Sequence, residues 1–132
     1  MLVNIDQVRH PLDGFGLLTP AKERLSSLGV FFSSSLFEGR APNGHVALNV
    51  FLGGSRNPAL CTHGRDEVLR AAIADVHCLL GTEGDPVFHD TALIPRSTPR
   101  YEIGFGSTKS AMRQLEQSLP GLFLAGNCSA VF

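Results

Sequence analysis

Apolar positions near the middle of the chain follow the two-residue period of a β-strand. In residues 45–54, every second side chain from Val46 to Leu52 is aliphatic, whereas the side chains between them are mixed. This alternation predicts a strand with one buried face. Residues 29–36 begin with aromatic and β-branched side chains and predict a second strand. The connection over residues 38–44 is short enough for the two strands to pair antiparallel.

Two later segments show the spacing of amphipathic helices instead. Residues 65–81 predict a helix with Asp66 and Glu67 in its first turn and Gly81 as its stop. Its apolar stripe consists of Val68, Leu69, Ala72, Ile73, Val76, Leu79 and Leu80. Residues 107–119 predict a second helix with Ser107 as its N-cap. The side chains expected to face inward from it are Ala111, Met112, Leu115 and Leu119.

Shorter segments complete the predicted order of elements. Residues 85–94 predict a third strand, and the continuously apolar residues 122–126 predict a strand buried on both faces. We also expect an extended piece over residues 15–18 and a further strand near the start. The order β-β-α-β-α-β fits an α+β or an α/β protein. We predict the α+β class, with a mostly antiparallel or mixed sheet and two main helices.

The overall composition excludes some classes of function without naming one. The length of 132 residues is that of a single domain. A net charge of −1 and the absence of any Lys/Arg block argue against nucleic-acid binding. No run reaches the roughly 20 apolar residues of a membrane span. The first residues lack the pattern of a signal peptide, so we expect a cytoplasmic location.

No catalytic or metal-binding pattern is complete in the sequence. Residues 104–110, GFGSTKS, look like a phosphate loop but have Thr108 where such a loop needs Gly directly before Lys. The three serines at 33–35 lack the Gly-x-Ser-x-Gly elbow of hydrolases. The five histidines show no metal-ligand spacing, and no CxxC pair is present. We therefore predict no catalytic residue and no metal ligand.

Four segments, in order, resemble a known family. They are HPLDGFGLLTP at 10–20, LGVFFSSSLFEGRAPNGHVALNVFLGG at 28–54, PRSTPRYEIG at 95–104 and LPGLFLAGN at 119–127. Together they resemble the C-terminal half of the oxygen-dependent protoporphyrinogen oxidases, FAD enzymes of the amine-oxidase-like group. The resemblance implies that residues 1–121 form the substrate-binding (cap) domain. Residues 122–132 would then be the truncated last strand and flavin turn of the FAD domain.

The resemblance also implies site residues. Gly126 and Asn127 would form the turn that meets the flavin, where a bare glycine backbone lets the chain approach a ring closely. Ile94, Arg96, Arg100 and Tyr101 would contact the substrate, since arginine suits the carboxylates of a porphyrinogen. The family pattern has Trp, Gln and His at the positions of Ile94, Arg100 and Phe105, so this chain departs from it near the substrate.

A second departure concerns the cofactor. The Gly-x-Gly-x-x-Gly fingerprint that binds the pyrophosphate of FAD in the family is absent from these 132 residues. After Asn127 the sequence reads CSAVF, where the family continues through a glycine-rich stretch into a helix. We therefore expect a fragment of a longer flavoprotein, or a short remnant gene. We do not expect this chain to retain FAD by itself.

These features define one principal function and two alternatives. The resemblance implies the substrate-binding fragment of an FAD oxidoreductase that oxidises a porphyrinogen in heme or tetrapyrrole biosynthesis, with oxygen reoxidising the flavin and the fragment inactive alone. A membrane surface would concern only the full-length enzyme. The alternatives are a non-catalytic tetrapyrrole-binding module and a structural domain that forms homo-oligomers through the exposed apolar strand at residues 122–126.

Overall fold

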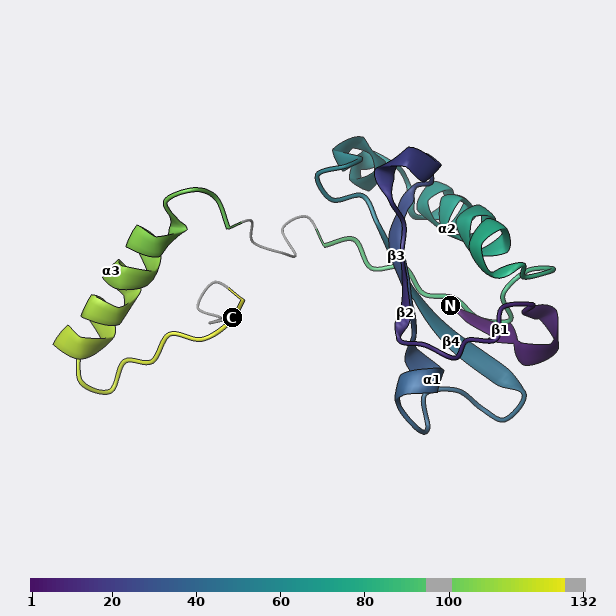
Figure 1. Ribbon diagram of the computed structural model, residues 1–132, viewed down its shortest axis with the longest axis horizontal. Helices are drawn as coiled ribbons and strands as arrows, with labels where there is room; N and C mark the ends of the chain where they lie inside the picture. Colours follow the sequence, from purple (N-terminus) through teal and green to yellow (C-terminus); the bar gives the residue numbers. More distant parts are fainter. Residues whose placement is uncertain (95–100, 128–132) are drawn as a thin grey trace. The chain divides into compact units, whose positions relative to one another are not determined.

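The computed structural model describes residues 1–94 and 101–127. The chain divides into two compact units, residues 1–93 and 94–132, which are considered separately (Figure 1). The first unit holds a sheet and its covering helix, and the second holds one long helix with the segment that follows it. The architecture is α+β with two main helices, as the hydrophobic pattern predicts.

A four-stranded antiparallel sheet organises the first unit. Its strand order is β1-β4-β3-β2. The strands are β1 (Leu2–Asn4), β2 (Gly16–Leu18), β3 (Ser27–Phe32) and β4 (His45–Leu52). The extended piece expected over residues 15–18 is thus β2, and the further strand expected near the start is β1. Short helices occupy the connections: η1 (Ile5–Gln7), η2 (Ala21–Glu23), α1 (Ser33–Leu36) and η3 (Pro58–Thr62).

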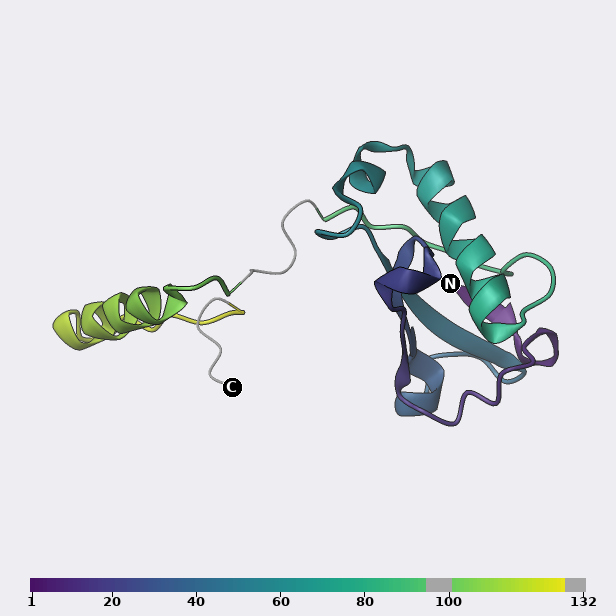
Figure 2. The ribbon, with the colours of Figure 1, turned by 45° about the horizontal axis from the view of Figure 1, so that its top comes forward.

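The helix α2 (Arg65–Leu80) covers one face of this sheet (Figures 1 and 2). Its boundaries match the prediction, with Asp66 and Glu67 in the first turn and Gly81 in the left-handed conformation at the C-terminal cap (φ 61°). The buried cluster between helix and sheet consists of Val3, Leu12, Val30, Phe32, Val46, Leu48, Val76 and Leu80. Each such side chain contributes about 1.5–3 kcal/mol through burial, so this layer stabilises the first unit.

A buried carboxylate also joins α2 to the sheet. The register between β3 and β4 shifts between Ser27 and Gly29, which is the signature of a β-bulge. The Ser27 N–H donates to Oδ2 of Asp75 at 2.5 Å. Both residues are buried, Ser27 completely. Asp75 therefore provides the acceptor for an amide of a strand that is irregular at this point.

The N-terminal residue, Met1, directly precedes β1 and contacts β4. The Met1 ammonium donates to the carbonyl oxygen of Leu48 at 2.8 Å. Burial lowers the pKa of this ammonium below its ordinary value of 8.0, and the negative charge of Asp90 opposes the shift. In this polypeptide the first residue is thus a packed part of the fold.

Two strand predictions in the first unit need correction. The strand expected over residues 29–36 ends at Phe32, and residues 33–36 form the helical turn α1. Serine has little preference for strands, and Ser34 Oγ instead accepts the Ala47 N–H at 3.0 Å. The strand expected over residues 85–94 is reduced to a single bridge between Leu2 and Phe88. Its available neighbour, β1, is only three residues long.

The second unit consists of α3 (Phe105–Ser118) and a segment that returns along it. The N-cap residue is Gly104, so the prediction of Ser107 as N-cap was wrong. Ser107 lies inside the first turn, where its hydroxyl donates to the Gly104 carbonyl at 2.7 Å. Over the described residues 119–127 no strand forms, because no neighbouring strand is present to pair with residues 122–126.

The apolar face of α3 is not buried, contrary to the prediction. No residue of the helix is buried, and Leu115 and Leu119 keep 45% and 51% of their surface exposed. Ala111 is exposed and Met112 half-buried. Within the part of the chain that the structure describes, no helix combines the length and apolar character required to cross a bilayer.

Candidate functional site

The structure brings together two residues that the sequence assigned to different partners. Tyr101 was expected at the substrate and Asn127 at the flavin. The Tyr101 hydroxyl donates to the backbone carbonyl of Asn127 at 2.5 Å. The ring of Tyr101 also packs against Phe105, with the ring centroids 4.8 Å apart at 52°. These contacts place the end of the returning segment beside the N-terminal turn of α3.

The turn that ends with Asn127 presents bare backbone. Gly126 has a φ of 119°, which side-chain-bearing residues rarely adopt, and a Cβ built on it would have no atom within 4 Å. Open space around an unshielded backbone is what a flat ring requires for close approach. The assignment of Gly126 and Asn127 to the isoalloxazine, the ring system that supplies hydride chemistry in flavoproteins, stays a prediction.

One side-chain contact from α3 and one backbone contact at its C-terminal cap hold the returning segment. The Leu124 N–H donates to Oε1 of Glu116 at 2.8 Å, and the Leu122 N–H donates to the Leu119 carbonyl at 3.0 Å. Glu116 thus supplies the acceptor that a neighbouring strand would supply in a sheet. No sequence pattern indicated this contact.

Of the other predicted substrate residues, only Ile94 is described by the structure. Ile94 is 63% exposed. Arg96 and Arg100 lie outside the described residues. Their assignment to substrate binding therefore stays a prediction.

Two apolar surfaces are exposed, and the aromatic one on the sheet was not predicted from the sequence. On the open face of the sheet, Phe31 packs edge-on against Phe15 at 5.8 Å and against Phe51 at 5.4 Å. The three rings keep between 41% and 66% of their surface exposed. Strand alternation could have indicated this surface. It places Phe31 and Phe51 on the face of the sheet that points away from the core, where polar residues are expected.

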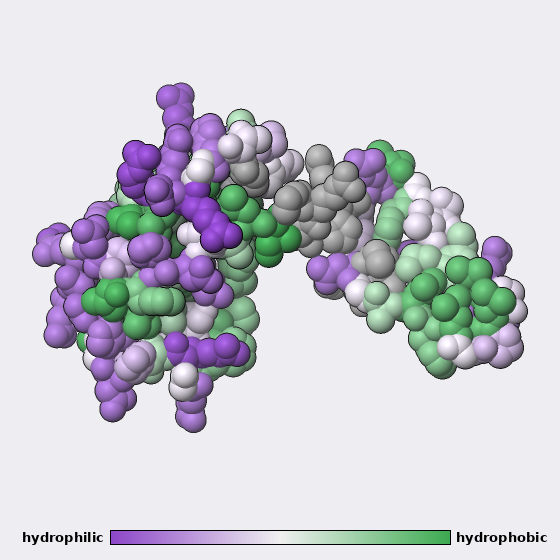
Figure 3. All heavy atoms as spheres, turned by 180° about the vertical axis from the view of Figure 1, so that it is seen from behind, coloured by the Kyte–Doolittle hydropathy of each residue, from purple (hydrophilic) through white to green (hydrophobic). Residues whose placement is uncertain are grey.

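The second apolar surface belongs to the second unit. Figure 3 shows apolar atoms gathered over the C-terminal part of α3 and the segment after it. We call this surface the α3 patch; it comprises Leu115, Leu119 and Phe123, the last 86% exposed. A surface of this kind marks an interaction site more often than a free face.

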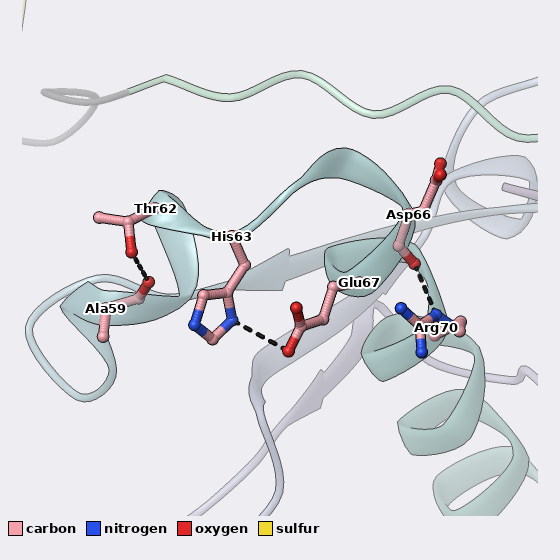
Figure 4. Close-up of polar contacts among 6 residues, drawn as sticks. All are labelled: Ala59, Thr62, His63, Asp66, Glu67 and Arg70. Atoms are coloured by element: carbon pink, nitrogen blue, oxygen red, sulfur yellow. Dashed lines mark hydrogen bonds and ion pairs between the residues drawn. The ribbon is translucent and has the colours of Figure 1, made fainter.

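Charged residues near the start of α2 stabilise the helix and do not form a reactive centre (Figure 4). His63 Nδ1 lies 3.2 Å from Glu67 Oε1, with both side chains about half exposed. Arg70 Nε donates to the Asp66 carbonyl at 3.3 Å. Such exposed pairs contribute roughly 0–1 kcal/mol. Among the described residues, no group of three His, Cys, Asp or Glu side chains could hold a metal ion.

Comparison with known proteins identifies the group to which this chain is related. Residues 6–131 match the family described as flavin containing amine oxidoreductase. The chain is 40% identical over 125 residues to the mitochondrial protoporphyrinogen oxidase of Nicotiana tabacum, which covers 92% of this chain and 25% of the relative. Protoporphyrinogen oxidase 2 of Arabidopsis thaliana is 38% identical over the same shares of the two chains.

A bacterial relative has a different printed activity. The coproporphyrinogen III oxidase of Propionibacterium freudenreichii is 38% identical over 76 residues, which covers 58% of this chain and 14% of the relative. The chain thus spans about a quarter of the length of the plant relatives and less of the bacterial one. On the match over residues 6–131 and on these identities, the chain belongs to the flavin-containing amine oxidoreductase family.

Proposed function

We propose that this chain is the substrate-binding part of a protoporphyrinogen-oxidase-like FAD oxidoreductase of heme or tetrapyrrole biosynthesis. The observation that carries the proposal is the 40% identity to such an oxidase over 92% of the chain. The two related plant enzymes are both named protoporphyrinogen oxidases, and the bacterial relative acts on another porphyrinogen by its name. A reduced tetrapyrrole is therefore the proposed substrate class.

In this proposal the flavin lies against the turn at Gly126 and Asn127. Its support is the backbone at Gly126, where φ is 119° and a built Cβ would have no described atom within 4 Å. The division into a cap over residues 1–121 and a flavin segment over residues 122–132 remains part of the proposal.

We further propose that the isolated chain neither retains FAD nor oxidises substrate. The sequence lacks a Gly-x-Gly-x-x-Gly loop for the pyrophosphate, and a flavin turn alone offers only a small contact. The cytoplasmic location, or attachment to a membrane as part of a longer enzyme, stays a prediction.

Purified 132-residue chain tests the proposal with two measurements. We expect no flavin absorption in the purified protein and no formation of protoporphyrin from protoporphyrinogen IX above the rate in buffer. We also expect added protoporphyrin to bind, measured by its fluorescence change on titration. Failure to bind any porphyrin would contradict the substrate assignment. Oxidation of protoporphyrinogen IX by the isolated chain would contradict the proposal that the chain is inactive by itself.

Self-association is the second candidate function, and the α3 patch favours it. Leu115, Leu119 and Phe123 are large apolar side chains that keep 45%, 51% and 86% of their surface exposed. The route through an exposed strand edge at residues 122–126 is lost, because these residues form no strand. Sedimentation equilibrium distinguishes the candidates: a dimer that dissociates on Phe123→Ser substitution and binds no porphyrin would favour the structural domain.

A further inference from the structure

The hydrogen bond between Tyr101 and Asn127 joins two points 26 residues apart in the sequence. We propose that Tyr101 is a positioning residue that fixes the Gly126–Asn127 turn, and that it is not a substrate contact. The inference rests on the proposed function in one respect, namely that this turn meets the flavin.

The phenol is held so that its hydroxyl reaches the turn. The Tyr101 ring packs on Phe105, the first residue of α3, with the centroids 4.8 Å apart. A tyrosine side chain has only two flexible torsions, and a contact with a neighbouring ring restricts them further. The hydroxyl then donates to a backbone carbonyl, so the contact fixes the path of the chain at residue 127 without any side chain there.

The returning segment needs such a contact because it has no strand beside it. It is tied to α3 at its start by Leu122 N–H to the Leu119 carbonyl, and in its middle by Leu124 N–H to Glu116. Tyr101 provides the tie at its end.

A turn built on glycine has a large conformational freedom to lose. Gly126 has no neighbouring atom where a side chain would be, and glycine has the largest conformational freedom of any residue. A backbone that is already ordered binds a rigid ring with higher affinity, because no conformational entropy is then lost on binding. The Tyr101 contact supplies this order.

The test compares Tyr101→Phe with the wild-type chain, using Glu116→Ala as the matched control. Tyr101→Phe keeps the ring on Phe105 and removes only the hydroxyl. In the isotope-labelled 132-residue chain, we expect Tyr101→Phe to move the Asn127 carbonyl-carbon resonance upfield while amide exchange at Leu124 changes less than twofold. A net hydrogen bond is worth about 1 kcal/mol, so Glu116→Ala, which removes the acceptor, should speed exchange at Leu124 up to about fivefold and leave the Asn127 carbonyl unchanged.

An Asn127 carbonyl resonance that is the same in the wild type and in Tyr101→Phe would overturn the inference. Titration with FAD separates this failure from failure of the proposed function. The FAD titration uses a chimera in which this chain replaces the 125 matching residues of the mitochondrial protoporphyrinogen oxidase of Nicotiana tabacum. We expect the chimera to bind FAD more weakly when it carries Tyr101→Phe. A carbonyl difference in the 132-residue chain together with equal FAD affinity of the two chimeras would keep the Tyr101 contact and overturn its role toward the flavin.

Discussion

Replacing Asp75 with alanine tests how the helix α2 is joined to the sheet. The substitution removes the carboxylate that accepts the Ser27 N–H at 2.5 Å. Ser27 is completely buried, so water cannot replace the lost acceptor. The shifted register at Ser27 marks this stretch of β3 as irregular, which makes the side-chain acceptor matter more.

The expected loss follows from the cost of an unpaired buried amide. Leaving a buried donor without a partner costs about 1–3 kcal/mol. Removal of a buried carboxylate also relieves its desolvation, which places the expected value near 2 kcal/mol. For a unit of this size, 1 kcal/mol lowers the melting temperature by roughly 4–8 °C, so Asp75→Ala should lower it by about 8–16 °C.

Thermal and urea unfolding followed by circular dichroism measure this loss. Asp75→Asn retains an oxygen acceptor and should lose less stability than Asp75→Ala. Asp66→Ala, on the exposed first turn of the same helix, is the matched control and should cost less than about 1 kcal/mol. If Asp75→Ala melts like the wild type, or if the Ser27 amide stays protected from exchange in that variant, the reasoning about this contact is refuted.

Three further substitutions or conditions probe the first unit. Gly16→Ala should destabilise the first unit by roughly 2 kcal/mol, because a Cβ there would lie 2.3 Å from a backbone oxygen of β3. The control Gly14→Ala has open space and should leave the stability nearly unchanged. Equal urea midpoints for the two variants would refute this prediction. Phe31→Ala should cost about 1–3 kcal/mol, since the ring contacts two other aromatic rings, and an unchanged midpoint would contradict that. The pKa of the Met1 ammonium is lower in the folded chain than in the unfolded chain. Between the folded pKa and pH 8.0 the unfolded chain therefore binds more protons than the folded chain, so the free energy of unfolding should rise with pH in this range. A chain acetylated at Met1 should lack this rise, and a rise of the same size in both forms would assign it to other groups.

Strong periodicity made part of the fold predictable. The alternation in β4 and the apolar stripe of α2 each repeat several times, so single residues do not alter the pattern, and Gly81 ends the helix where expected. The strand expected at residues 85–94 failed because a strand needs a partner of sufficient length, and β1 has only three residues. Local sequence does not state how long the neighbouring strand will be.

The site was less predictable than the fold. Asp75 lies seven residues after Val68 and three after Ala72, so helical spacing places it on the inward face; only the fold reveals its partner in β3. The contact of Tyr101 with Asn127 spans 26 residues and involves a backbone atom, which no side-chain pattern records. Family resemblance singled out both residues but gave no indication that they touch.

The most direct test of the central claim transplants this chain into a relative. In the chimera, the 125 matching residues of the mitochondrial protoporphyrinogen oxidase of Nicotiana tabacum are replaced by their counterparts from this chain. The measurement is the FAD content per polypeptide of the purified, soluble protein, with Gly126→Val as the control variant because valine is strained at a φ of 119°. The account predicts about one FAD per chimera, as one flavin contacts one turn, and a clear loss of FAD in Gly126→Val. A soluble, folded chimera that purifies without FAD, or one whose FAD content Gly126→Val leaves unchanged, would contradict the account.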